Sequence, residues 1–361
     1  MGLISGFEDL EKRIVGQGAC TGCGACVISC QYKDIIEYSE GKPNSVGECQ
    51  ICGFCSHVCP RYALQRTELE RFVFGRVRKR EEDFGVCRDI YVAKSTDNEV
   101  LKHCQDGGVA TALINMALDS DIIDGAIISG VNPSIPWLPM PFFSTNKHET
   151  VRYAGTRYTY SPNLLALGKN TGEFARLAFV GTPCQIRALR QMEKILYCIR
   201  PDLDKKIYFL AFTIGLFCSE SFTYEGLMQK KIQNEMGIDL NDIEKINIKG
   251  GMLLTLKNGK TVKIPLKEVR PYAEEKCAYC DDFSAEFADI SLGGVGLDRR
   301  TFAVIRTEQG EKIFNQAIQQ KKLDIKPVNE FARAYNLLIR LSKNKQSNAR
   351  KIEEQYIIAK K

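Results

Sequence analysis

Eight of the chain's fifteen cysteines fall between residues 20 and 59, in two copies of one spacing, C-x2-C-x2-C-x3-C. The first copy comprises Cys20, Cys23, Cys26 and Cys30, and the second comprises Cys49, Cys52, Cys55 and Cys59. Three thiolates spaced in this way can cover three corners of an iron–sulfur cubane from one tight loop, and the fourth ligand then comes from the other copy. We therefore predict two [4Fe–4S] clusters within a small cysteine-rich module.

The exchange of the fourth ligand also predicts which cysteines share a cluster. One cluster is assigned to Cys20, Cys23, Cys26 and Cys59, and the other to Cys49, Cys52, Cys55 and Cys30. Zinc is the alternative metal because it also binds C-x2-C pairs, but tetrahedral zinc needs four ligands per ion and not this triplet plus one. The module resembles a bacterial-type ferredoxin over residues 14–62, with Gln31 where that motif usually has proline.

The remaining composition is that of an ordinary soluble globular protein, with 44% hydrophobic and 26% charged residues. No run approaches eighteen apolar residues, so we expect no transmembrane segment. The first residues lack the apolar stretch of a signal peptide, and fifteen cysteines in such a chain indicate metal or redox chemistry in place of disulfides. A net charge of +6 does not call for nucleic acid as a partner. We expect a cytoplasmic protein, free or peripheral on a membrane complex.

Downstream of residue 88, the sequence alternates between strand-like and helix-like segments. The expected strands are 90–94, 124–131, 176–181, 206–217 and 303–306, and the expected helices are 107–118, 185–192, 222–236 and 311–319. Asn258-Gly259 between two further apolar runs, 252–256 and 261–265, predicts a β-hairpin. This alternation favours a mixed or parallel sheet covered by helices.

The predicted organisation is a small α+β module followed by a mixed-sheet α/β domain. Residues 1–68 form the module, 69–88 a linker, 89–330 the larger domain, and 331–361 a helical tail. Five basic residues and then three acids lie within 71–83, and we interpret this run as a solvated connecting strap. The basic end of the tail is interpreted as a frayed, solvated helix.

Seven cysteines lie outside the doubled motif, and only Cys277 and Cys280 form a close pair. Their spacing fits half of a zinc or an iron–sulfur site. Cys184 and Cys218 each follow a predicted strand, which is where α/β sheets place cofactors. A buried structural role fits Cys184 and Cys218 equally well, and spacing alone leaves these alternatives open.

Six ordered stretches between residues 88 and 330 carry a resemblance to a known family. They are QDGGVATAL (Gln105–Leu113), AGTRYTYSPN (Ala154–Asn163), VGTPCQ (Val180–Gln185), GLFC (Gly215–Cys218), KCAYCDDF (Lys276–Phe283) and GGVGLDRRTFAVIRT (Gly293–Thr307). The region resembles the beta subunits of F420-reducing hydrogenases, F420H2 dehydrogenase and F420-linked formate dehydrogenases. With the cysteine-rich module in front, the layout is similar to the F420H2-oxidising input subunit of a larger complex.

This resemblance implies a third [4Fe–4S] cluster on Cys184, Cys218, Cys277 and Cys280, and a bound FAD. The implied flavin-binding residues are Gln105, Asp106, Gly107, Gly108, Thr111, Arg157, Tyr158, Thr159, Ser161, Pro162, Asn163 and Thr182. Gly107-Gly108 opens a predicted helix, whose N–H groups and dipole suit a phosphate. Arg157 supplies a fixed positive charge for the same purpose.

The implied function is electron transfer between coenzyme F420 and the three clusters by way of FAD. A hydride would pass from reduced F420 to FAD, and single electrons would then pass to a partner protein, or the reverse. The implied partner is a membrane F420H2 dehydrogenase, a heterodisulfide reductase, a hydrogenase or a formate dehydrogenase. No catalytic side chain is assigned, because the cofactors carry the chemistry. The alternatives are an electron-relay protein without flavin and a related flavoprotein reductase acting on another substrate.

Overall fold

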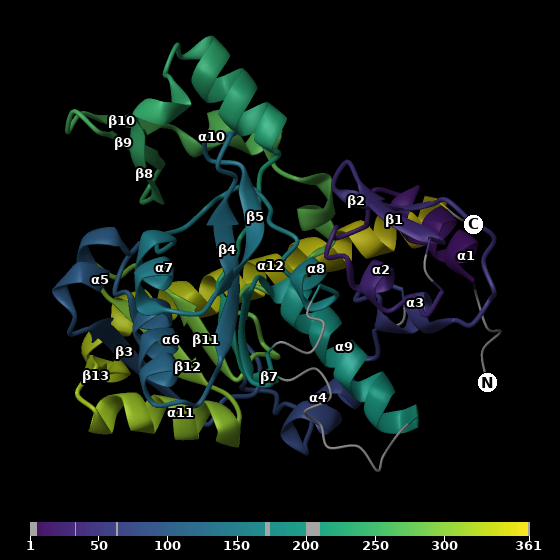
Figure 1. Ribbon diagram of the computed structural model, residues 1–361, viewed down its shortest axis with the longest axis horizontal. Coiled ribbons are helices and arrows are strands. Elements are labelled where there is room, and N and C mark those ends of the chain that lie inside the picture. Colours follow the sequence, from purple (N-terminus) through teal and green to yellow (C-terminus); the bar gives the residue numbers. More distant parts are fainter. Residues whose placement is uncertain (1–5, 33, 63, 170–173, 200–209, 360–361) are drawn as a thin grey trace.

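The computed structural model describes residues 6–32, 34–62, 64–169, 174–199 and 210–359. Its largest element is an eight-stranded mixed sheet (Figure 1). In spatial order the strands are β13 (Leu323–Pro327), β3 (Asp89–Ser95), β12 (Thr301–Ile305), β11 (Ile290–Gly293), β7 (Leu210–Leu216), β6 (Leu177–Gly181), β4 (Gly125–Val131) and β5 (Pro139–Ser144). The expected mixed α/β architecture is therefore confirmed.

The centre of the sheet is parallel and its margins are antiparallel. Strands β4, β6, β7 and β11 run parallel, whereas β5 pairs antiparallel on one side and β12, β3 and β13 pair antiparallel on the other. All five residues of β6 are buried, as are five of the seven in β4. Such continuous burial is typical of parallel strands that are covered by helices on both faces.

Neighbouring residues of one strand belong to separate cores on the two faces of the sheet. Ala93 of β3 packs with α6 (Val109–Asp119) and α11 (Glu308–Gln319). Val92 points the other way and packs with α12 (Ala332–Ala359). On that second face, α4 (Arg66–Phe74) and α9 (Pro183–Ile199) cover β6. The sheet is thus the middle of three layers, with α6 and α11 together on one side (Figure 1).

The cysteine-rich N-terminal region forms its own small core. It contains α1 (Phe7–Leu10), α2 (Ala25–Ile28), β1 (Ile36–Ser39), β2 (Lys42–Ser45) and α3 (Phe54–Val58), with β1 and β2 paired antiparallel. Phe7 and Leu10 pack there against Ile35, Ile36 and cysteines of both motif copies. Helices α2 and α3 contact α9, and α2 also contacts α8 (Leu164–Leu167), so the region is seated against the larger domain.

A third group of elements lies beyond one end of the sheet, at the top of Figure 1. It comprises a π-helix (Tyr224–Glu235), the antiparallel strands β8 (Ile243–Ile248), β9 (Met252–Leu256) and β10 (Thr261–Ile264), and α10 (Leu266–Val269). Gly259 adopts φ +83° in the turn between β9 and β10, which is why glycine follows asparagine there. The predicted hairpin is confirmed.

Two short helices beside the sheet begin at side-chain caps. Asp97 accepts a hydrogen bond from the Glu99 N–H at the start of α5 (Asn98–His103), and Asn146 does the same for Glu149 in α7 (Lys147–Arg152). Caps of this kind satisfy N–H groups that have no partner within the helix. Helices α5 and α7 contact each other next to the segments implied in flavin binding.

Most of the predicted elements are found, and several strands went unpredicted. The predicted segments 90–94, 124–131, 176–181 and 303–306 overlap strands β3, β4, β6 and β12, and the four predicted helices are also present. Residues 206–209 of the predicted strand 206–217 lie outside the described residues, while the rest becomes β7. Strands β1, β2, β5, β8, β11 and β13 were not predicted.

The tail is helical, as predicted, and forms α12. Within its basic end Ala349 is buried, so the interpretation of that end as a solvated helix is wrong at this residue. Helix α4 crosses residue 68, the predicted end of the first domain, and the domain limits remain a prediction.

None of the helices in the described ranges combines the length and the apolar character needed to cross a membrane.

Candidate metal centre and cofactor site

The first cysteine group surrounds a cavity at the N-terminal region. Cys20, Cys23, Cys26 and Cys59 all line it, together with apolar residues such as Leu10 and Ile14. Gly24 adopts φ +81° directly before α2, and a side chain at this position would collide with Leu165. A cavity lined by four thiols and apolar groups fits the chemistry of a cubane cluster. The four lining cysteines are those predicted to share one cluster, and ligation itself remains a prediction.

The second group belongs to the same small core. Cys55 has Cys49 and Cys52 as electrostatic neighbours, and Cys30 packs in the same apolar cluster as Cys49 and Cys55. Burial, followed by the neighbouring thiols, raises the pKa of Cys55 to about 11. The Phe7 N–H donates to the Cys49 sulfur at 3.3 Å, as backbone donors do toward thiolate ligands of clusters. Helix α3 begins after Gly53, which adopts φ +79°.

The third group draws its cysteines from three separate parts of the chain. Cys184 lies in the first turn of α9 directly after β6, Cys218 follows β7, and Cys277 and Cys280 lie in and just after the 3-10 helix Glu275–Tyr279. Cys218 has the other three as electrostatic neighbours, and Cys277 has Cys184 and Cys280. The four cysteines therefore meet at the carboxyl ends of two parallel strands, where α/β sheets place ligands.

No three His, Cys, Asp or Glu side chains within the described ranges are arranged to hold one metal ion. A cubane requires a different placement of its ligands, because each of the four thiolates binds a separate iron at a corner of the cluster. Ligands of a single zinc ion must all lie within bonding distance of one point. Clusters on these cysteines therefore remain a prediction, as do their number and type.

A tyrosine connects the first and third cysteine groups. Cys184 is an electrostatic neighbour of Cys20, and the Tyr160 hydroxyl lies 3.8 Å from the Cys184 sulfur. Burial, then Cys184 and Cys23, raises the pKa of Tyr160 well above its ordinary value. The ammonium of Lys276 lies 4.0 Å from the centre of the Tyr160 ring. Sequence analysis had no signal for this role, because Tyr160 and Lys276 are brought to Cys20 only by folding.

The first implied flavin segment lies between α5 and α6. Gly108 adopts φ +68° before α6, and a Cβ on Gly107 would lie 2.6 Å from the Ala93 carbonyl oxygen, so packing also requires both glycines. Thr111 is buried within α6. Gln105 donates from Nε2 to the Tyr158 hydroxyl at 3.3 Å.

Two polar side chains of this segment fit an additional ligand. Oε1 of Gln105 is buried and has no hydrogen-bond partner among the described residues. Burial raises the pKa of the neighbouring Asp106, against the lowering effect of Lys249 and Lys245. The Lys245 ammonium donates to the Cys104 carbonyl at 2.6 Å. These lysines come from β8 and the turn after it, and sequence analysis did not single them out. A buried acceptor without a protein partner is the feature expected of a site that receives a hydrogen bond from a ligand.

The second implied segment is buried at Thr159, Ser161 and Asn163, and its arginine has a structural role. Arg157 donates to the carbonyls of Tyr153, Ala154 and Gly155, which follow the end of α7. Burial lowers the pKa of Arg157 to about 10. Tyr158 meets Gln105, so the two implied segments come together. The bonds of Arg157 to backbone carbonyls are a second use of the guanidinium that sequence analysis did not foresee.

The rest of the segment ties the loop to β6. The Asn163 amide donates to the Val180 carbonyl at 2.9 Å and its Oδ1 accepts from Ser161 at 2.7 Å. Pro162 precedes α8, and the backbone of Thr159 bridges to Phe222. The Thr182 hydroxyl lies 3.2 Å from the Cys184 sulfur. This loop therefore supports the third cysteine group, while flavin contact by these residues remains a prediction.

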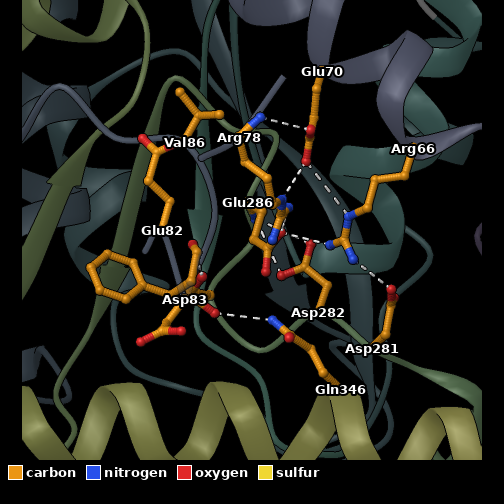
Figure 2. Close-up of polar contacts among 12 residues, drawn as sticks. Arg66, Glu70, Arg78, Glu82, Asp83, Val86, Asp281, Asp282, Glu286 and Gln346 are labelled. Atoms are coloured by element: carbon orange, nitrogen blue, oxygen red, sulfur yellow. Dashed lines mark hydrogen bonds and ion pairs between the residues drawn. The ribbon is translucent and has the colours of Figure 1, made fainter. Parts of the chain in front are cut away.

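A buried ion network joins α4 and the segment after it to Asp281 and Glu286 (Figure 2). Glu70 and Glu286 are each only 1% exposed, and Arg78 contacts both. Arg66 joins Glu286 at 2.6 Å and Asp281 at 2.7 Å. The interpretation of segment 71–83 as a solvated strap is thus wrong at Arg78, because this segment docks onto the residues that follow Cys280.

The comparisons with known proteins agree with the fold. The matching family is described as coenzyme F420 hydrogenase/dehydrogenase, beta subunit; residues 90–168 match its N-terminal part and residues 174–330 its C-terminal part. The beta subunit of the coenzyme F420 hydrogenase of Methanothermobacter thermautotrophicus is 34% identical over 270 residues, covering 74% of this chain and 94% of that protein.

Two further comparisons extend this result. A component of the F(420)H(2) dehydrogenase of Methanosarcina mazei is 30% identical over 332 residues, covering 87% of each chain. A chain in the structure of the F420-reducing [NiFe] hydrogenase complex from Methanosarcina barkeri superposes with a TM-score of 0.70 at 31% identity, covering 77% of this chain and 95% of that one. The chain belongs to the family of coenzyme F420 hydrogenase/dehydrogenase beta subunits.

Proposed function

We propose that this protein is an F420-linked redox subunit that carries FAD and three [4Fe–4S] clusters and exchanges electrons between coenzyme F420 and a partner complex. The observation that carries the proposal is the convergence of Cys184, Cys218, Cys277 and Cys280, from three parts of the chain, beside the group that contains Cys20. Relatives named for F420 hydrogenase, F(420)H(2) dehydrogenase and F420-dependent formate dehydrogenase support the substrate.

FAD would supply the exchange between a hydride, which carries two electrons, and the single electrons that a cluster accepts. The protein's own residues would bind and orient the cofactors. Gln105, whose buried Oε1 has no hydrogen-bond partner among the residues that the structure describes, would hold the flavin through a hydrogen bond. The N-terminal end of α6 would suit a phosphate. The three cysteine groups would hold the clusters, and the side chain of Tyr160 would exclude water between the first and third groups.

The order of the groups supports a relay toward the N-terminal region. Cys20 of the first group neighbours Cys184 of the third, and Cys26 of the first neighbours Cys55 of the second. The second group lies in the region with exposed apolar residues, Ile51 and Val46, at 59% and 55% exposure. Electrons would therefore leave or enter the chain at the second group, and the partner would belong to a hydrogenase, dehydrogenase or related complex.

The test is anaerobic oxidation of F420H2 with an artificial one-electron acceptor, on protein assayed for iron and flavin. We expect turnover by protein with about twelve irons and one FAD per chain, as three cubanes require. A full complement without turnover would reject F420 as the substrate and favour a related reductase. Full iron without flavin would favour an electron-relay role.

A further inference from the structure

Helix α12 brings a lysine to the third cysteine group. The Lys345 ammonium donates to the Cys218 carbonyl at 2.6 Å and to the Ser219 carbonyl at 2.7 Å. Cys280, Cys218 and Cys277 are electrostatic neighbours of the ammonium, and so is Asp282. Lys345 lies 127 positions after Cys218 in the sequence, yet its side chain is hydrogen-bonded to the loop that contains Cys218.

The residues around Lys345 show that this placement is specific to it. Lys343, two positions earlier, is 58% exposed and pairs with Asp83 at 3.0 Å. Gln346 donates from its amide to the Asp83 carbonyl at 3.0 Å, on the side of α12 drawn in Figure 2. Helix α12 is therefore held by contacts to Asp83 as well as to Cys218, which fixes the helix and the position of the Lys345 ammonium.

A second cation near the group is already neutralised. Arg187 neighbours Cys280, and its guanidinium forms an ion pair with Asp281 at 2.7 Å. The hydrogen bonds of Lys345 go instead to uncharged backbone carbonyls. Its charge is therefore available to act on the cysteine site, and the Asp282 carboxylate opposes it.

Reduction of a [4Fe–4S] cluster adds one electron and hence one negative charge, without forming or breaking a covalent bond. A fixed positive charge nearby stabilises the reduced form more than the oxidised form, and net charge and hydrogen bonding are known to set cluster potentials. We propose that Lys345 is a positioning residue that raises the reduction potential of the cluster held by Cys184, Cys218, Cys277 and Cys280. This inference rests on the proposed function, because it requires that third cluster.

A raised potential at the third group would favour electron transfer from the flavin to this group. A higher potential at the third group makes it a better acceptor for electrons that arrive singly from a flavin. The group lies next to Tyr160 and Cys20, so electrons accepted there have a short onward route. Helix α12 would in this way contribute to electron transfer although it contains no cysteine.

The test is an anaerobic redox titration of the full chain, followed by electron paramagnetic resonance, with dithionite as the reductant. The signal of the third cluster is the one lost in Cys184→Ser. In Lys345→Gln, which keeps an amide donor for the carbonyls but no charge, we expect the ratio of reduced to oxidised cluster to fall about tenfold at a fixed potential. That change is a shift of about 59 mV to more negative potential for a one-electron couple.

Two variants serve as controls. Lys345→Arg keeps the charge and should keep the wild-type potential, and Lys351→Gln removes an exposed charge further along α12 and should leave the potential unchanged. An unchanged potential in Lys345→Gln would overturn the inference. Loss of the third cluster in Lys345→Gln but not in Lys345→Arg would also overturn it, because the lysine would then act only in holding the loop. Wild-type protein with about eight irons per chain would instead reject the third cluster and the proposed function with it.

Discussion

Arg66 Nη2 lies 2.6 Å from Glu286 Oε2, and this ion pair joins α4 to the segment that follows Cys280. Glu286 is also paired with Arg78, and its side chain is 1% exposed. Burial favours the neutral carboxyl, but Arg66 and Arg78 outweigh it and lower the pKa of Glu286 below its ordinary value. The N-terminal region and the third cysteine group are thus connected by buried charges as well as by apolar packing.

Glu286→Ala should strongly destabilise the protein. It removes one of the two buried carboxylates that face Arg66 and Arg78, so that Glu70 is the buried carboxylate left to balance both guanidinium groups. Breaking a buried ion pair costs about 3–5 kcal/mol. The free energy of unfolding, measured by urea titration under anaerobic conditions, checks this. Glu311→Ala is the matched control, because its pair with Arg88 is 41–46% exposed and should cost at most about 1 kcal/mol. Equal losses in the two variants would contradict a stabilising role for the network.

Cys184→Ser should remove one cluster while leaving the other two in place. Iron content should fall from about twelve to about eight atoms per chain, because serine is a poor replacement for a thiolate ligand. Cys198→Ser is the control, since Cys198 lies on the same helix, α9, and is exposed. Iron analysis and the absorbance of the clusters provide the measurement. Retention of all the iron in Cys184→Ser would show that Cys184 is not a ligand.

Gln105→Leu should weaken flavin binding without unfolding the protein. The buried Oε1 has no partner in the described part of the chain, so its removal should change the stability of the flavin-free protein by no more than about 1 kcal/mol. Loss of a hydrogen bond to flavin should lower affinity about tenfold, which corresponds to about 1.4 kcal/mol. Fluorescence titration with FAD measures this. Gln320→Leu, at the exposed end of α11, should bind normally, and an unaltered affinity in Gln105→Leu would place the flavin elsewhere.

Glu82 should contribute stability that acid removes. Hydrogen bonding to Arg76 lowers the pKa of Glu82 from 4.5 to about 2. The ionised carboxylate is therefore more stable in the folded protein than in the unfolded chain. This contribution is fully present above pH 4.5 and is lost as the pH falls toward 2. The stability gap between wild type and Glu82→Gln should therefore be constant from about pH 7 to 5 and shrink below 4.5.

Urea midpoints measured across this pH range test the expectation. Cluster loss in acid affects both proteins alike, so the difference between them isolates Glu82. Glu37→Gln, which alters an exposed residue of β1, is the control and should differ little from wild type at any pH. A gap that stays constant down to about pH 3 would mean that Glu82 is not held by Arg76 in solution.

The sequence by itself determined the local parts of this structure. Spacing in the doubled motif pointed to the cavity that Cys20, Cys23, Cys26 and Cys59 line, because ligands from a tight loop are set by short-range geometry. Continuous apolar runs marked β4 and β6, since strands buried on both faces need apolar residues throughout. Asn258-Gly259 marked the hairpin, because its turn needs positive φ.

Only the tertiary structure decided which distant residues meet. Strands β11 and β13 are short and lacked a periodic signal, so pairing with neighbours defines them. Burial of Arg78 depends on Glu286, which lies 208 positions away in the sequence. Without knowledge of such distant partners, a run of charged residues is interpreted as solvated. Lys345 and Tyr160 reach the cysteine groups only through chain folding. Local pattern reports the conformation of a segment, whereas long-range contacts depend on the packing of the whole chain.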